Sequence, residues 1–260
     1  GEGAYNGLNF NSGNTQIATD SGDILLSGIN GTTGSTAISL YNNASVNISS
    51  ISGEIGLLGV KSNMTTSGTG LGIESGSSLY VGSPSDDSFT SSGDITVYLD
   101  YGTSIVGSLR FKSSGDLNIL SMAGPSFLSS VTLPSGSLEG IFDNVSIGAS
   151  GNTSTLNIND AFSAGGNISI YGGEINLGGN ISKTSGGDST LTIAGTGAVT
   201  LNAGANISSS SSTGKMDVAI SGNNVTLNGS ISKTNGGDST LTVSGTGTVT
   251  LTSGVTILNT

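Results

Sequence analysis

Residues 178–204 read GGNISKTSGGDSTLTIAGTGAVTLNAG, and residues 228–254 read NGSISKTNGGDSTLTVSGTGTVTLTSG. Nineteen of these 27 positions are identical at a constant offset, without a gap. A repeat at a fixed period indicates a stacked architecture, in which each unit buries its apolar face against the next. Short alternating runs such as STLTI and AVTLN are followed by glycine, so the repeated unit consists of β-strands and turns.

The same alternation of apolar and small polar residues recurs outside the repeat. It is seen in SGDILLSG (21–28), TAISLYNN (36–43), ASVNISSI (44–51), GEIGLLGV (53–60), GDITVYLD (93–100) and STLNIND (154–160). A sandwich or a barrel could give this strand spacing, but neither explains a long duplication without gaps. We therefore predict an all-β chain: a right-handed parallel β-helix of roughly 10–13 rungs of three short strands each, without an α-helix longer than a turn or two. At this rung length, one period of the repeat corresponds to two rungs.

Strand alternation also predicts which side chains point inward. These are the apolar residues of the repeat, Leu191, Ile193, Val199 and Leu201, with their counterparts Leu241, Val243, Val249 and Leu251. Thr190, Thr192 and Thr200 alternate with them and should point outward.

Composition excludes several classes of function. The 260 residues carry a net charge of −11 with only six Lys and Arg, whereas phosphate backbones require clustered basic residues, so nucleic-acid binding is not expected. No apolar run approaches the roughly 20 residues that span a bilayer, so membrane insertion is not expected either. The absence of cysteine excludes disulfides, thiolate metal sites and cysteine nucleophiles.

No catalytic, cofactor or metal site is expected. The chain has no His and a single Arg, so the usual sets of base, nucleophile and oxyanion-stabilising groups are hard to assemble. The nearest carboxylate pair is Asp86 and Asp87, which we interpret as solvated loop residues. GGDST at 186–190 and 236–240 resembles a calcium-binding repeat, but a single Asp in each copy favours a turn in which Gly allows positive φ and Asp188 or Asp238 accepts hydrogen bonds from backbone amides.

Residues 80–142 interrupt the regular pattern. They contain all three prolines, the single arginine and seven of the twelve aromatic residues, namely Tyr80, Phe89, Tyr98, Tyr101, Phe111, Phe127 and Phe142. We expect one β-helical unit over 1–260 with an irregular part at 80–142, where 83–93 and 121–140 form longer turns or loops outside the column. The aromatic residues either stack in the core or form a recognition surface, because aromatic and Arg side chains anchor interfaces. If they bind a partner, the predicted contacts are Tyr98, Tyr101, Arg110 and Phe127.

The phrases NISKTSGGDSTLTIAGTGAVTLNAG, GDLNI (115–119), GNISI (166–170), GGEINLGGNIS (172–182) and NVTLNGSIS (224–232) resemble bacterial exoproteins of the two-partner secretion family. These include filamentous haemagglutinin, the high-molecular-weight adhesins and the contact-dependent inhibition exoproteins. The resemblance covers 145–260 well and 1–80 loosely. No Asn-Pro-Asn-Gly motif of the family's N-terminal domain is found, so the chain resembles a piece of the shaft of a longer protein.

The resemblance implies a parallel β-helix that is exported through an outer-membrane partner and displayed at the surface of a Gram-negative cell. Family functions are adhesion to host cells, capture of a host protein and carriage of a toxin. The expected function is therefore a non-enzymatic segment of a secreted surface filament that binds a protein or glycan receptor on a cell or host. The alternative is a β-helical polysaccharide-processing enzyme or a phage-type fibre segment. A cleft lined by several acidic residues on one face would favour the enzyme.

Overall fold

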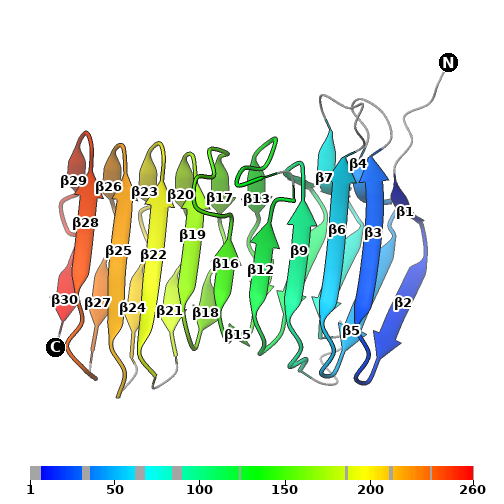
Figure 1. The fold of residues 1–260 in the computed structure, drawn as a ribbon, viewed down its shortest axis with the longest axis horizontal. Helices are drawn as coiled ribbons and strands as arrows, with labels where there is room; N and C mark the ends of the chain where they lie inside the picture. Colours follow the sequence, from blue (N-terminus) through cyan, green and yellow to red (C-terminus); the bar gives the residue numbers. More distant parts are fainter. Residues whose placement is uncertain are drawn as a thin grey trace.

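The chain winds into a three-sided column of parallel β-strands (Figure 1). The computed structural model describes residues 7–30, 36–61, 68–83, 90–122, 124–184, 187–210, 213–234 and 236–259. In Figure 1 the near strands run upward while the chain advances from right to left, so the β-helix is right-handed. No α-helix occurs among the described residues. The predicted fold is confirmed.

Each side of the column is formed by every third strand, except that β14 and β15 follow each other on side II, and we number the sides in chain order. Side I contains β1 (Leu8–Asn11), β4 (Thr36–Tyr41), β7 (Thr69–Ile73), β10 (Thr103–Ile105), β13 (Val131–Leu133), β17 (Leu156–Ile158), β20 (Ile175–Leu177), β23 (Val199–Leu201), β26 (Val225–Leu227) and β29 (Val249–Leu251). Side II contains β2 (Asn14–Thr19), β5 (Ser45–Ser50), β8 (Ser78–Gly82), β11 (Ser108–Lys112), β14 (Leu138–Glu139), β15 (Ile141–Phe142), β18 (Phe162–Ala164), β21 (Ile181–Lys183), β24 (Ile207–Ser209), β27 (Ile231–Lys233) and β30 (Ile257–Asn259). Side III contains β3 (Ile24–Asn30), β6 (Ile55–Lys61), β9 (Ile95–Leu99), β12 (Leu117–Leu120), β16 (Val145–Ile147), β19 (Ile168–Gly172), β22 (Ser189–Gly195), β25 (Met216–Gly222) and β28 (Leu241–Gly245).

One turn of the chain through the three sides is called a coil. The described strands form nine complete coils and a tenth with two strands, at the lower end of the expected number. The reason is that the early coils are long: Ile24 pairs with Ile55, and Ile55 pairs with Ile95. Later coils are shorter, and Ile168 pairs with Leu191.

Side III is one continuous nine-stranded sheet, whereas sides I and II are each divided into two sheets near the middle of the column. The division on side I falls between β10 and β13. Here hydrogen bonds of Thr103 connect the two strands in place of a regular ladder. Its amide donates to the Ser130 carbonyl, and its hydroxyl oxygen accepts the Thr132 amide at 2.8 Å. The continuity of side III gives it the longest regular outer face of the molecule.

The repeat seen in the sequence corresponds to two coils, as predicted, because β22 pairs with β25 and β25 pairs with β28. Leu191, Ile193, Val199 and Leu201 are buried in the core, and the alternate threonines 190, 192 and 200 point outward. Leu241 and Val243 are half-buried, whereas Val249 and Leu251 are 40% and 50% exposed. These last two side chains lie in the tenth coil, the last coil among the described residues.

The segment 121–140, expected to form longer turns or loops outside the column, lies within the column. It contributes β13 and β14 to the column, and the Phe127 side chain is buried in the core. Of the other expected loop, 83–93, residues 84–89 lie outside the described residues, as do Asp86 and Asp87. Proline and glycine in 121–140 therefore mark turns between strands of a coil and not an excursion from it.

The turn from side II to side III is built from stacked glycines, each preceded by a buried serine. The amides of Gly53, Gly93 and Gly115 donate to the hydroxyl oxygens of Ser50, Ser91 and Ser113. A Cβ atom on Gly93 would lie 2.0 Å from the Gly53 carbonyl oxygen of the preceding coil. Glycine is required there because successive coils place their backbones in direct contact.

The core also contains a lysine. Lys183 is 2% exposed, points inward beside Ile181, and lies in register with Ala164 and Ser209. Its Nζ donates to the Gly165 carbonyl at 3.5 Å. Burial lowers the pKa of Lys183 below the ordinary lysine value, and the positive charge of Lys233 lowers it further.

This lowered pKa predicts that the column gains stability as the pH rises toward the ordinary lysine pKa of 10.5. The unfolded chain binds more protons than the folded chain over the interval between the two pKa values, so the free energy of unfolding increases with pH there. Urea unfolding of the wild type and of Lys183→Met, from neutral pH to above the ordinary lysine pKa, measures the effect. The difference in unfolding free energy between the two proteins should shift in favour of the wild type as the pH rises. A difference that is constant with pH would contradict the prediction.

Candidate functional site

Two of the four predicted contact residues lie in the core. Tyr101 is 2% exposed and Phe127 is 3% exposed. Phe111 and Phe142 are buried with them, so most of the aromatic residues of 80–142 fill the column, and Phe89 lies outside the described residues. The expectation that Tyr101 and Phe127 meet a partner is corrected by this placement, because neither side chain reaches the surface.

The other two predicted residues lie on different sides of the column. Arg110 projects from side II, where its guanidinium lies 5.0 Å from the centroid of the Tyr80 ring and donates to Glu139 at 3.1 Å and to the Ser83 carbonyl at 3.3 Å. Its side chain is only 11% exposed, so these contacts hold it against the column. Tyr98 projects from side III and is half-buried. The structure therefore does not bring Tyr98 and Arg110 into one site.

Tyr98 belongs to a row of apolar side chains on the outer face of side III. Leu58 pairs with Tyr98, and Tyr98 pairs with Leu120, so the three side chains occupy the same position in coils 2, 3 and 4. We call these three residues the apolar row. In coil 1 the same register position holds Ser27, and Leu25 and Ile29 on the same face, two residues before and after it, are 66% and 58% exposed. The apolar row itself is half-buried, and together with these two exposed side chains it forms an apolar patch on a regular sheet, which indicates a contact surface.

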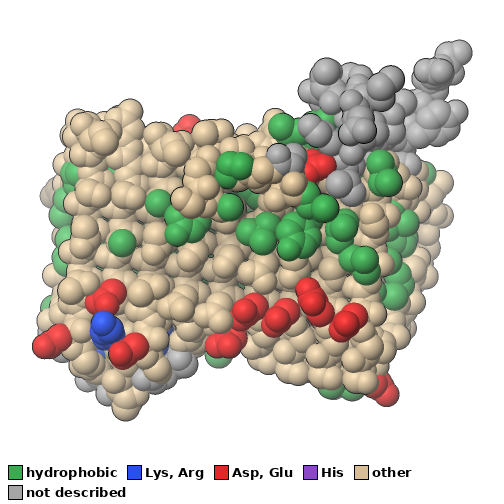
Figure 2. Space-filling model, in the orientation of Figure 1, with side chains coloured by type: hydrophobic (Ala, Val, Ile, Leu, Met, Phe, Trp, Pro, Cys, Tyr) green, Lys and Arg blue, Asp and Glu red, His purple; other side chains and the backbone are tan. Residues whose placement is uncertain are grey.

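A row of carboxylates runs parallel to the apolar row. Asp23, Glu54, Asp94 and Asp116 each precede the first residue of a side III strand, and those first residues are in register. We call these four residues the acidic row. Figure 2 shows a line of acidic side chains across the N-terminal half of this face, with hydrophobic side chains above it.

Hydrogen bonds from the next coil fix the three aspartates of the acidic row. Asp23 Oδ1 accepts the Glu54 amide at 2.9 Å, and Asp94 Oδ1 accepts the Asp116 amide at 2.8 Å. Asp116 Oδ1 in turn accepts the backbone and side-chain N–H groups of Asn144 at 3.0 and 2.9 Å. Each of these side chains thus satisfies the amide at the same corner of the next coil, which explains why Asp and Asn are suited to this corner.

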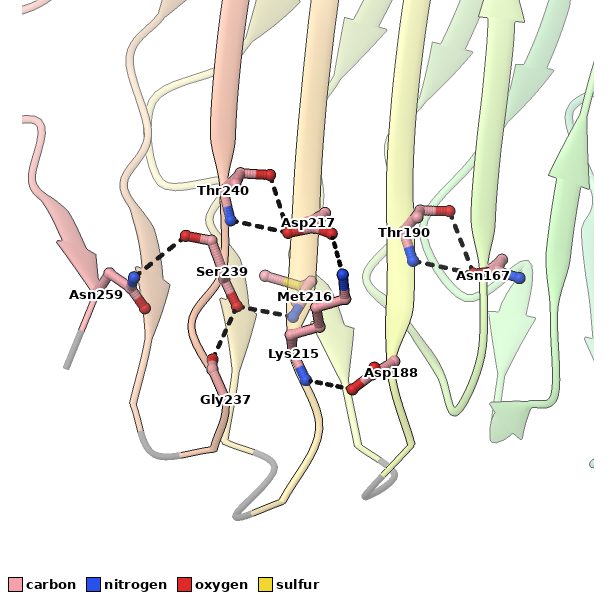
Figure 3. A network of polar contacts seen from close by, with 10 residues as sticks. All are labelled: Asn167, Asp188, Thr190, Lys215, Met216, Asp217, Gly237, Ser239, Thr240 and Asn259. Atoms are coloured by element: carbon pink, nitrogen blue, oxygen red, sulfur yellow. Dashed lines mark hydrogen bonds and ion pairs between the residues drawn. The ribbon is translucent and has the colours of Figure 1, made fainter.

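The same corner continues into the C-terminal half with uncharged residues and one exception (Figure 3). Asn167 Oδ1 accepts the Thr190 amide at 2.9 Å, and Asp217 Oδ1 accepts the Thr240 amide at 2.8 Å. The pKa of Asp217 is lowered by the Thr240 amide and by Lys215, whose Nζ lies 3.0 Å from Asp217 Oδ2. Asp188 accepts the Lys215 amide at 3.0 Å, in agreement with the turn interpretation of GGDST.

The outer face of side III changes character between its two halves. In coils 7 to 9 the outward positions that follow the corner residues are Thr192, Ala194, Ala219, Ser221, Thr242 and Ser244. These side chains are small and offer little apolar area to a partner. The four residues of the acidic row thus lie in coils 1 to 4 and the three residues of the apolar row in coils 2 to 4, although the backbone of side III is continuous. Tyr171 in coil 6 lies in line with the apolar row, from which Gly148 separates it.

A strip of smaller residues separates the acidic row from the apolar row. It consists of Gly56, Thr96 and Asn118, which occupy one register position in coils 2 to 4, and Thr96 is 8% exposed. At the N-terminal end of the strip, a surface hollow is lined by Asp23, Ile24, Leu25, Glu54 and Gly56. Carboxylate and aliphatic groups thus meet in one depression.

This arrangement is suited to binding more than to chemistry. The acidic row lies on the outer face of a sheet, where Asp23 and Glu54 border the hollow and Asp94 and Asp116 are not among its lining residues. The described Arg and Lys side chains nearest in sequence, Arg110 and Lys112, belong to side II. Within the described ranges, no three His, Cys, Asp or Glu side chains come together in a way that could hold a metal ion. The described residues also include no helix long and apolar enough to cross a membrane.

Sequence reasoning missed the acidic row, although a signal is present. The tripeptides Gly-Asp-Ile at 22–24 and 93–95, Gly-Glu-Ile at 53–55 and Gly-Asp-Leu at 115–117 open the four strands. The spacings between successive tripeptides are unequal, so a search at fixed period does not align them. A search for a glycine and an acid before each alternating strand would have found the row.

Comparison with protein-family models, with curated proteins and with solved structures found no match to the chain.

Proposed function

We propose that this chain is a non-enzymatic binding segment of a secreted bacterial surface filament, with an adhesive or receptor-binding role. The observation that carries the proposal is the outer face of side III in coils 1 to 4, where the apolar row lies beside the acidic row. Sheet backbone holds both rows, so little conformational entropy is lost when a partner binds. The resemblance of the sequence to two-partner secretion exoproteins supports the cellular setting: export of the parent protein through an outer-membrane partner, and a protein or glycan receptor on another cell.

Binding of the purified chain to host and bacterial cells tests this proposal. The labelled wild type should bind cells of the target type saturably. The variant Leu58→Ser/Tyr98→Ser/Leu120→Ser should lose most of that binding, because it removes the apolar row without altering inward side chains. Tyr41→Ser is the matched control, since Tyr41 is also half-buried but lies in β4 on side I. Equal binding by the triple variant and the wild type would contradict the assignment of this face.

The acidic row favours a second candidate, a polysaccharide-processing enzyme. Carboxylates on adjacent coils are carried by strands about 4.8 Å apart, near the separation of about 5 Å that retaining glycosidases use. Release of reducing ends from acidic and neutral bacterial polysaccharides tests this candidate. If the wild type released reducing ends and Asp94→Asn did not, the enzymatic function would replace the binding function.

A further inference from the structure

We infer that the outer face of side III in coils 1 to 4 binds a basic amphipathic α-helix of a partner protein, lying along the axis of the column. The inference rests on the proposed binding function and names the class of partner for the same face. Three features support it: the charge of the acidic row, the spacing of both rows along the column axis, and the distance between the two rows.

Charge complementarity requires a basic partner. The acidic row places four carboxylates on four successive coils, and Asp23, Glu54 and Asp94 are exposed. Among the side chains described on side III of these coils there is no Lys or Arg. Lys61, whose side chain lies outside the described residues, is at the opposite end of β6 from Glu54. Lys and Arg side chains of a partner would neutralise this row, and the field of the row would also speed their approach.

The axial spacing of the rows matches an α-helix. Successive coils are about 4.8 Å apart, and one turn of an α-helix rises about 5.4 Å. Over the three steps from coil 1 to coil 4 the mismatch therefore accumulates to about 2 Å, which flexible Lys and Arg side chains can absorb. An extended strand repeats its side chains on one face about every 6.6–6.8 Å, and it would fall out of step with the coils much sooner.

The width of the face also fits a helix. The acidic and apolar rows are four residues apart along each strand, or about 13 Å, which is close to the diameter of about 10–12 Å of a helix with its side chains. The side chains of the strip between them, Gly56, Thr96 and Asn118, are smaller than those of the two rows, so a helix could pack against the strip. A helix with basic residues on one flank and apolar residues on the other would contact both rows at once.

The hollow at the N-terminal end suits a single basic side chain. Leu25 and Ile24 would contact its methylene groups, and Asp23 and Glu54 would meet its charged end. Gly56 leaves the space open, because a Cβ atom there would lie 2.8 Å from Leu25 Cδ1. A Gly56→Val substitution should therefore fill the hollow and weaken helix binding.

The test uses the full chain and a fluorescein-labelled synthetic helix of about 18 residues. The helix carries Lys or Arg at i, i+4, i+7 and i+11 on one flank and Leu on the adjacent flank. Fluorescence anisotropy should show binding that weakens with added salt. Glu54→Gln/Asp94→Asn/Asp116→Asn should reduce the affinity at least about tenfold, because three charge pairs are lost. A scrambled peptide of the same composition should bind at least about tenfold more weakly than the helix.

Matched controls separate binding from folding. Asn already occupies this corner at Asn144 and Asn167, where its side-chain oxygen accepts the next coil's amide, so the amide variants should fold, which circular dichroism verifies. Asp217→Asn removes a carboxylate from the same corner in the C-terminal half and should leave helix binding unchanged. Leu58→Ser/Tyr98→Ser/Leu120→Ser should weaken binding while Tyr41→Ser does not.

Three outcomes would overturn the inference. The first is equal affinity of the charge variant and the wild type. The second is equal binding of the scrambled peptide. The third is self-association of the chain that the apolar-row substitutions abolish, which sedimentation velocity detects and which would assign the face to a second copy. If the chain binds cells through this face but does not bind the helix, the class of partner is wrong and the binding function stands; if the chain binds neither, both proposals fail.

Discussion

Replacing Leu191 by Asp is expected to lower the free energy of unfolding by on the order of 3–5 kcal/mol, because it leaves an unpaired charge in the core. Leu191 is 1% exposed and lies in register between Ile168 and Val218 of the adjacent coils. The side chain belongs to the apolar core, so the carboxylate would be surrounded by apolar atoms. Urea unfolding followed by circular dichroism measures the change.

Thr192→Asp is the control for this prediction. Thr192 follows Leu191 directly in β22 and projects outward, between Ser169 and Ala219. The same new charge should therefore change the free energy of unfolding by no more than about 0.5 kcal/mol. If both variants lost the same stability, the inward register of β22 would be refuted.

Gly93→Ala is expected to have the second largest effect, a loss of about 3 kcal/mol, as for an overpacked core. The added methyl group would lie 2.0 Å from the Gly53 carbonyl oxygen of the preceding coil, and that atom belongs to backbone that the ladder holds in place. The chain would have to separate two coils at this corner to accommodate it. Thermal unfolding of the variant and the wild type gives the difference.

Gly187→Ala provides the comparison, since a Cβ atom there would meet nothing within 4 Å. Its stability should equal that of the wild type or exceed it slightly, because alanine restricts the unfolded chain. A loss at Gly187 as large as that at Gly93 would mean that backbone entropy, and not close packing of coils, governs glycine in this fold.

The architecture could be predicted from the sequence because the repeat and the strand alternation report the same stacking. The offset between the two copies equals two coils, and the alternation at 189–201 assigned Leu191 and Thr192 to opposite faces, as the structure confirms. Both signals are local or strictly periodic. The repeat and the alternation can therefore be recognised in the sequence without knowing which residues of neighbouring coils pair.

The candidate site could not be predicted in the same way, because it depends on which residues of unequal coils fall into register. Tyr98 was predicted as a contact from its chemistry, but its neighbours Leu58 and Leu120 lie far from it in the sequence and at unequal separations. Tyr101 has the same chemistry, and only its position past the end of β9 buries it. Composition identified a region rich in aromatic residues, and pairing between coils decided which of them reach the surface.

The exact register of the repeat has a consequence for how the length of such a chain can change. Because β20 and β26 occupy equivalent positions, removing residues 179–228 would join β20 directly to β27 through the same turn, and β18 and β19 would stack on β27 and β28. The excised piece is two whole coils, so the rod would shorten by about 10 Å and create no interface of a new kind. Unequal recombination between the two near-identical segments would perform this excision or its reverse. The rod can thus become longer or shorter in steps of two coils. The outer face of side III in coils 1 to 4 does not change when it does so.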